Sequence, residues 1–138
     1  MTEKWRWLES TYELQTNTYG YDLDWFAEGL RLDSPAVVKE LADYIDWNIT
    51  AAVQELAEAR IEFSWKPWAV DEPFVHRERL LNEIIDVNHF LGNVLTALGV
   101  SDFEYARAYE AKQEKNRGRA ASGSYSAKKG NLGEGSDV

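Results

Sequence analysis

Two acidic pairs stand inside helical apolar patterns, and they are the residues of this chain best suited to carry chemistry. Glu55 and Glu58 form the first pair, and Glu83 and Asp86 form the second. Residues three apart are neighbours on a helix, with Cβ atoms about 5–6 Å apart, so each pair can offer two carboxylates to one point. If the two helices lie antiparallel, four carboxylates converge, and a cation must neutralise them. Carboxylate oxygens favour Mg²⁺ or a similar hard ion.

The second acidic pair is the more informative one. Glu83 and Asp86 interrupt an apolar stripe next to Ile84 and Ile85, where a charged carboxylate costs free energy unless it is paired or binds a metal ion. His89 follows Asp86 by three residues, and we expect it to be a buried, hydrogen-bonded histidine or to orient Asp86. The first pair also fits an alternative, a solvated acidic face, which is common on helices.

Long helices must position both pairs, and the apolar periodicity predicts them. Residues 34–35, Ser-Pro, are a helix-start signal, and a helical period then continues until Pro67 forbids it. This pattern fits one helix, or two with a bend near residues 47–48. A second long helix is expected over residues 74–98, with Gly99 as its stop. We predict further helices at residues 3–18, 25–30 and 102–117.

Composition narrows the class of protein. The chain has 138 residues, of which 44% are hydrophobic, and its six Trp residues supply large packing surfaces, so we expect one domain with a substantial core. It has no cysteine, which excludes disulfides and thiolate metal sites. The N-terminus lacks the apolar core of a signal peptide, and no apolar run approaches the ~20 residues of a membrane span. We therefore expect a cytoplasmic protein without a membrane partner.

The net charge of −9 is unevenly distributed along the chain. Residues 1–106 are strongly acidic, which argues against nucleic-acid binding, because that needs basic surface to neutralise phosphates. Residues 107–129 carry an excess of Lys and Arg, which suits a small polyanion or the acidic body of the same or a neighbouring chain. We predict a domain over residues 1–119 and a flexible or partner-ordered tail over residues 120–138, which is rich in Ser, Gly and Lys.

Further motifs accompany the acidic pairs in a fixed order. ExxE at 55–58 is followed by Trp-Lys-Pro-Trp at 65–68, and ExxD at 83–86 is followed by His-Phe at 89–90. This order resembles the all-α nucleoside triphosphate pyrophosphohydrolase superfamily, which contains MazG-like proteins and the dimeric all-α dUTPases, and the dUTPase branch is the closer of the two. The last helix adds the Tyr-x2-Lys-x3-Asn-x2-Arg pattern of that branch, formed by Tyr109, Lys112, Asn116 and Arg119.

The resemblance implies an all-α bundle of four to five helices, completed by oligomerisation into a homodimer or a tetramer. It implies a nucleotide pyrophosphohydrolase that hydrolyses a deoxynucleoside triphosphate, with dUTP as the first candidate. Attack at the α-phosphorus would release pyrophosphate and a nucleoside monophosphate. One or two Mg²⁺ ions, with Mn²⁺ as a substitute, would be held by Glu55, Glu58, Glu83 and Asp86. Glu55 would also serve as the general base for the attacking water.

The resemblance also implies side chains that contact the substrate. The phosphate-binding candidates are cationic: Lys66, Lys112 and Arg119. The candidates for binding the base or the sugar are aromatic or amide residues: Asn116, Trp65, Trp68, Gln15 and Tyr109.

Two other functions remain open at this point. The tail lacks the complete Arg-Gln and Gly-Tyr pattern of the dUTPase branch, which leaves a house-cleaning pyrophosphatase for several, different or modified nucleotides as one alternative. The acidic body leaves a non-enzymatic helical adaptor or nucleic-acid mimic as the other. A panel of nucleotides separates the first alternative, and calorimetry with divalent cations separates the second.

Overall fold

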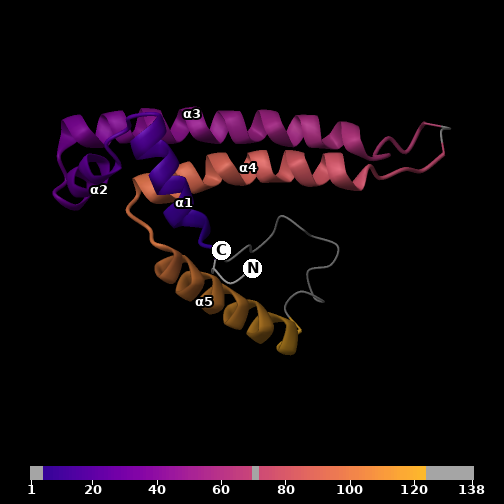
Figure 1. Cartoon of the computed structure of the whole chain (residues 1–138). Coiled ribbons are helices and arrows are strands. Elements are labelled where there is room, and N and C mark those ends of the chain that lie inside the picture. The colour runs from indigo at the N-terminus through magenta and orange to yellow at the C-terminus, as the bar shows by residue number, and fades with distance from the viewer. Residues whose placement is uncertain (1–4, 70–71, 124–138) are drawn as a thin grey trace. The chain divides into compact units, whose positions relative to one another are not determined.

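The computed structural model describes residues 5–69 and 72–123, and its regular structure is helical (Figure 1). No strand is present in these residues, and an isolated bridge between Phe63 and Val75 is their one β-type pairing. The prediction of an all-α protein is therefore confirmed. The α-helices are α1 (Trp7–Glu13), α2 (Leu23–Arg31), α3 (Pro35–Ala59), α4 (Arg77–Ala97) and α5 (Asp102–Ala121).

The chain forms two compact units, Met1–Asp102 and Phe103–Val138. The sequence had suggested a domain over residues 1–119, whereas here nearly all of α5 falls in the second unit. The greater part of the predicted tail, residues 124–138, lies outside the described residues. No single helix in the described ranges combines the length and the apolar character that a membrane span requires.

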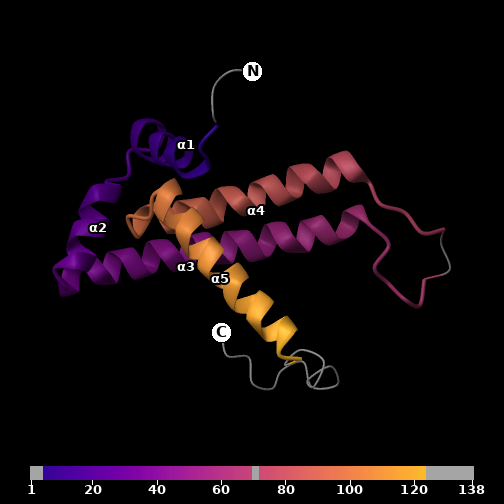
Figure 2. The same cartoon turned by 90° about the horizontal axis from the view of Figure 1, so that it is seen from below.

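α3 and α4 run antiparallel, side by side, and form a long hairpin (Figures 1 and 2). α3 begins at Pro35 after Ser34 and continues for 25 residues without a break at positions 47–48. A 3-10 turn, η2 (Arg60–Glu62), follows it. The acidic pairs thus lie on two antiparallel helices, which is the arrangement that convergence of their carboxylates requires.

α4 begins at Arg77, three residues later than residue 74, where the sequence placed its start. The reason is that the residues before it pair with the chain that leaves α3. The backbone N–H of Ser64 donates to the carbonyl of Phe74 at 2.9 Å, and that of His76 donates to the carbonyl of Glu62 at 2.7 Å. These two hydrogen bonds join the segment that leaves α3 to the segment that enters α4.

The apolar core lies at the end of the hairpin where α2 packs on α3. Gly29 makes this packing close: a Cβ atom there would stand 2.1 Å from Cγ1 of Val37. Any side chain at position 29 would therefore separate the two helices or displace Val37. The buried members of the core cluster are Leu23, Phe26, Val37, Leu41, Tyr44 and Ala97.

Buried polar side chains join three segments of the chain. The hydroxyl of Tyr44 donates to Oε1 of Gln15 at 2.7 Å, and Gln15 lies in the π-helical turn η1 (Leu14–Thr18) that follows α1. Nδ2 of Asn48 donates to the carbonyl of Tyr44, and Nδ2 of Asn93 donates to Oδ1 of Asn48, both at 2.9 Å. These bonds satisfy amide groups that would otherwise be buried at a cost.

α1 packs against α4, and its first turn is capped by a residue from the far end of the unit. The carboxylate of Asp102 accepts hydrogen bonds from the backbone N–H groups of Leu8, at 2.9 Å, and Glu9, at 3.0 Å. The first N–H groups of a helix have no partner within the helix, and a negative charge there also favours the helix dipole. Asp102 therefore stabilises a helix that begins 95 positions earlier in the sequence.

Candidate functional site

Three carboxylates converge between α3 and α4. Glu55, Glu58 and Glu83 each place one oxygen atom so that the three atoms lie within 4.8 Å of one another. We call these three residues the carboxylate cluster. Small side chains on α3 accompany it: Ala52 and Ala59 are both 4% exposed and let α4 approach closely. The helix hairpin therefore brings one member of the second acidic pair to both members of the first.

The cluster raises the pKa of Glu55 to about 7. The largest cause is loss of solvation, and the carboxylates of Glu58 and Glu83, together with the charge of Asp86, add to it. Each of these effects disfavours a further negative charge. Glu55 is consequently part-protonated near neutral pH, and a cation placed between the carboxylates would compete with that proton.

Glu83 supplies an independent sign that the cluster suits a cation. Its Oε2 atom is buried and has no hydrogen-bond partner among the described residues. A buried carboxylate oxygen without a partner is costly, and proteins usually pair such atoms. The donor set consists of carboxylate oxygens alone, which fits Mg²⁺ or Mn²⁺ and fits softer ions poorly.

Asp86, the fourth predicted ligand, is not part of the set that lies within 4.8 Å. It is half-buried one turn further along α4, and its charge still acts on Glu55. Its Oδ1 atom is 3.9 Å from Nδ1 of His89. The side chain of His89 is 58% exposed, so the expectation of a buried histidine is wrong. The reason is the rotation of α4, which turns position 89 away from α3.

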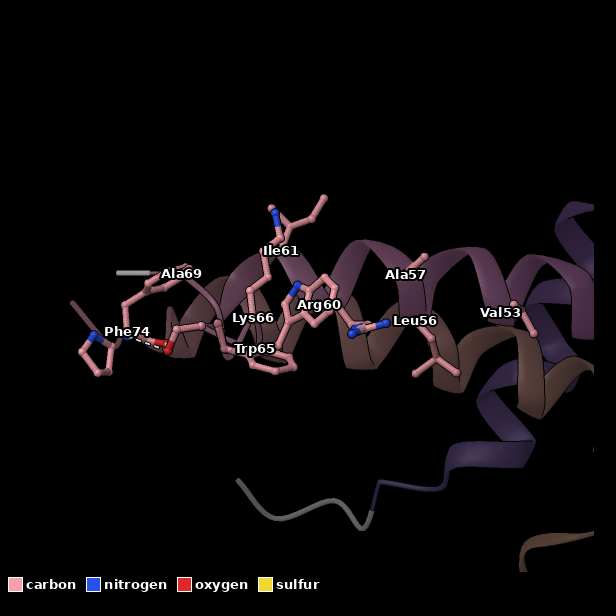
Figure 3. A pocket seen from close by; sticks show the side chains of 12 residues that line it. Val53, Leu56, Ala57, Arg60, Ile61, Trp65, Lys66, Ala69 and Phe74 are labelled. Carbon is pink, nitrogen blue, oxygen red and sulfur yellow. Dashed lines mark hydrogen bonds between the residues drawn. The ribbon is translucent and has the colours of Figure 1, made fainter. Parts of the chain in front are cut away.

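The Trp-Lys-Pro-Trp segment follows η2 and contributes to a pocket. Trp65 and Lys66 line a pocket of about 880 Å³ on α3 and the chain that follows it (Figure 3). Leu56 and Ala57 are among the lining residues, whereas the glutamates that flank them are not. Trp68 is 70% exposed and meets Trp65 edge to face, with ring centres 5.8 Å apart. The lining of this pocket therefore includes Trp65 and Lys66 from the predicted substrate contacts and none of the predicted metal ligands.

Arg60 is a residue of this pocket that the sequence reasoning missed. Its guanidinium carbon lies 3.5 Å from the centre of the Trp65 ring, which is a close cation–π contact. The sequence does contain a feature that indicates this contact. An arginine at the end of a helix can fold back on an aromatic residue in the loop that follows. The spacing alone did not indicate which aromatic residue it would meet.

Gln15 is buried, and its carbonyl oxygen is occupied by the Tyr44 hydroxyl. Tyr44 precedes Glu55 by three helical turns on α3, a separation of roughly 16 Å along the axis. Gln15 therefore lies in the core region and away from the carboxylate cluster.

The remaining predicted contacts all lie on α5, which belongs to the second unit. Their spacing of three, four and three residues places them along one face of this helix. Nε2 of Gln113 donates to the hydroxyl of Tyr109 at 2.8 Å. The residues in question are Tyr109, Lys112, Asn116 and Arg119.

Comparisons of the chain with protein-family models, with curated proteins and with solved structures found no match. The functional argument therefore depends on the chain's own residues, above all on the carboxylate cluster and the unpartnered oxygen of Glu83.

Proposed function

We propose that the chain is a Mg²⁺-dependent nucleoside triphosphate pyrophosphohydrolase that converts dUTP to dUMP and pyrophosphate. The observation that carries this proposal is the convergence of Glu55, Glu58 and Glu83, with one oxygen of Glu83 buried and unpartnered among the described residues. Carboxylates this close repel one another unless they are protonated or share a cation. The order of the motifs along the chain supports the choice of reaction and substrate.

In this proposal the cluster holds Mg²⁺, which supplies charge neutralisation at the triphosphate and acidifies a bound water. Glu58 comes from α3 and Glu83 from α4, so both helices of the hairpin contribute ligands. Asp86 completes the set after a small movement of its side chain, because it lies one turn from Glu83 on the same helix.

Glu55 accepts the proton in the reaction. A water oxygen attacks the α-phosphorus, the bond from that phosphorus to the bridging oxygen of the β-phosphate breaks, and pyrophosphate leaves with the bond electrons. The water proton passes to Glu55, the carboxylate that the resemblance assigns as the general base. The products are dUMP and pyrophosphate.

The motif order, and not the placement of α5, assigns substrate-binding roles to residues of this helix in the proposal. Lys112 and Arg119 bind phosphate oxygens, for which arginine offers a bidentate fork. Asn116 reads the base or sugar, because its amide both donates and accepts hydrogen bonds. Tyr109 shares their face of α5.

We further propose that the chain works as a homodimer. Apolar side chains on the hairpin support this, since half-exposed residues repeat at helical spacing on α4 and a stripe of this kind commonly marks a protein interface. They are Leu81, Ile84 and Leu91 on α4, with Ile49 on α3.

The test is a panel of nucleoside triphosphates, including dUTP, dCTP, UTP and an oxidised nucleotide, incubated with Mg²⁺ and assayed for pyrophosphate. We expect hydrolysis of dUTP with dUMP as the product. Equal rates across the bases would favour the house-cleaning alternative. Folded protein that hydrolyses no nucleotide and binds no divalent cation would overturn the proposal in favour of an adaptor.

A further inference from the structure

A pocket on α3 remains unexplained by the proposed hydrolysis. Its volume of about 880 Å³ lies in the range of small-molecule sites, and its wall is mainly apolar. The side chains that form this wall include Val53, Leu56 and Phe74 (Figure 3). Two cationic side chains, Arg60 and Lys66, stand among them. An apolar wall with few charged groups is the usual composition of a site for a small ligand.

Both cations of the pocket lack an acidic partner among the described residues, and this sets them apart within their unit. In the described part of Met1–Asp102, every other Lys and Arg forms a salt bridge. Arg60 and Lys66 instead share one indole: Arg60 lies 3.5 Å from the centre of the Trp65 ring, and Nζ of Lys66 lies 5.8 Å from it. In a strongly acidic chain, two cations without a carboxylate therefore stand among the residues that line one apolar pocket.

The orientation of Arg60 suits an anion. Its guanidinium lies beside the ring of Trp65 and extends along α3 toward Leu56 (Figure 3). The cation–π contact holds the planar group in place, and its N–H edge stays available for an acidic group. An acidic group bound there would place the rest of its molecule against Leu56 and Val53.

We propose that this pocket binds a small aromatic anion, with its acidic group on Arg60, its ring on the apolar wall, and Lys66 adding positive charge to the lining. The carboxylate cluster takes no part, because none of its glutamates lines the pocket. A nucleoside monophosphate and an aromatic carboxylic acid share this chemistry. The inference does not rest on the proposed hydrolase activity.

The experiment uses the full chain in buffer with EDTA, which removes divalent cations from the carboxylate cluster. The probe is 8-anilinonaphthalene-1-sulfonate, and its matched control is N-phenyl-1-naphthylamine, which has the same rings without the sulfonate. We expect the sulfonate to bind at least about 10-fold more tightly, because a charge-assisted hydrogen bond contributes roughly 1.5–3 kcal/mol. Equal affinity for the two probes would overturn the proposal, and this comparison needs no variant.

Variants then locate the bound probe. Replacing Arg60 and Lys66 together, as R60M/K66M, keeps the apolar stems and removes both charges, and we expect the affinity for the sulfonate to fall by about 10- to 100-fold. R31M/K39M is the matched control, because it removes the same two kinds of charge from exposed positions elsewhere in the unit. It should bind within about twofold of the parent chain. Equal losses in both variants would contradict the assignment.

Displacement of the probe identifies the source of the anion. Displacement by dUMP assigns the pocket to nucleotides, displacement by indole-3-carboxylate alone assigns it to aromatic acids, and displacement by neither overturns the proposal. The variant E83Q separates this inference from the proposed function. It should lose hydrolysis and still bind the sulfonate as the parent chain does, because Glu83 does not line the pocket.

Discussion

Nδ2 of Asn93 donates a hydrogen bond of 2.9 Å to Oδ1 of Asn48, and both side chains are buried where α4 meets α3. The substitution Asn48→Ala would leave the amide of Asn93 buried without its acceptor. We expect this variant to lose about 1–3 kcal/mol of unfolding free energy. Urea unfolding followed by circular dichroism measures the loss.

The matched control for Asn48 is Asn82→Ala, on the exposed surface of α4, which should stay within about 0.5 kcal/mol of the parent chain. The double variant N48L/N93L removes donor and acceptor together and should recover much of the lost stability, because two apolar groups leave no unpaired amide. If N48L/N93L loses as much as the sum of the losses of the single variants N48L and N93L, the hydrogen bond does not couple the two positions.

Gly29→Ala should destabilise the contact of α2 with α3. The new Cβ atom would stand 2.1 Å from Val37, and overpacking of this kind costs about 1–3 kcal/mol. Gly118→Ala on α5 is the control, since no atom lies within 4 Å of its new Cβ and alanine favours a helix by up to about 1 kcal/mol. Thermal unfolding compares the two variants. A G29A chain as stable as its parent would show that the helices can separate without cost.

The raised pKa of Glu55 predicts that the metal-free protein loses stability as the pH rises. Between the ordinary glutamate pKa of 4.5 and about 7, the folded chain keeps a proton that the unfolded chain has released. Stability from this group is therefore present below pH 4.5 and is lost as the pH rises through 7. Tm in EDTA should fall across this window.

Glu55→Gln keeps the shape of the side chain and removes its charge. The contribution of Glu55 to the fall in Tm should therefore disappear in this variant. Glu40→Gln, an exposed glutamate of the same helix, should leave the slope unchanged. The histidines are present in every variant, so their titration cancels in the comparison. Parallel pH profiles for E55Q and the parent chain would contradict the assignment.

Glu83→Gln should abolish both Mg²⁺ binding and hydrolysis while the chain stays folded. Glutamine replaces the carboxylate of Glu83 by a neutral amide. Hard cations prefer carboxylate ligands to neutral amides. Isothermal titration with Mg²⁺ and Mn²⁺ measures binding separately from activity. Glu78→Gln, on the exposed start of α4, is the matched control and should bind and hydrolyse normally. Retained Mg²⁺ binding in E83Q would remove Glu83 from the ligand set.

The sequence predicted the helices of the hairpin well, because their apolar residues recur with a helical period and Ser34-Pro35 and Gly99 mark ends. It also predicted that the two acidic pairs would converge if their helices lay antiparallel, and Glu83 of the second pair does meet the first pair. The position of Asp86 could not be read from spacing. It depends on the rotation of α4 about its axis, which packing against α3 decides.

The path of the Trp65 segment could not be predicted from the sequence either. It depends on hydrogen bonds between residues far apart in the chain, such as Ser64 with Phe74, and periodicity carries no information about these. The same limit explains the late start of α4 and the fold of Arg60 onto Trp65. Local patterns therefore predicted elements, and long-range contacts determined which side chains share a pocket.

The carboxylate of Asp102 holds the first turn of α1, and this has a consequence for the order of events during synthesis. Leu8 and Glu9 leave the ribosome early, but their backbone N–H groups receive this cap only after residue 102 has emerged. The N-terminal helix must wait for nearly the whole first unit before its final contact forms. Nascent chains that stop before residue 102 should therefore present α1 to proteases, whereas chains that extend well past it should protect it.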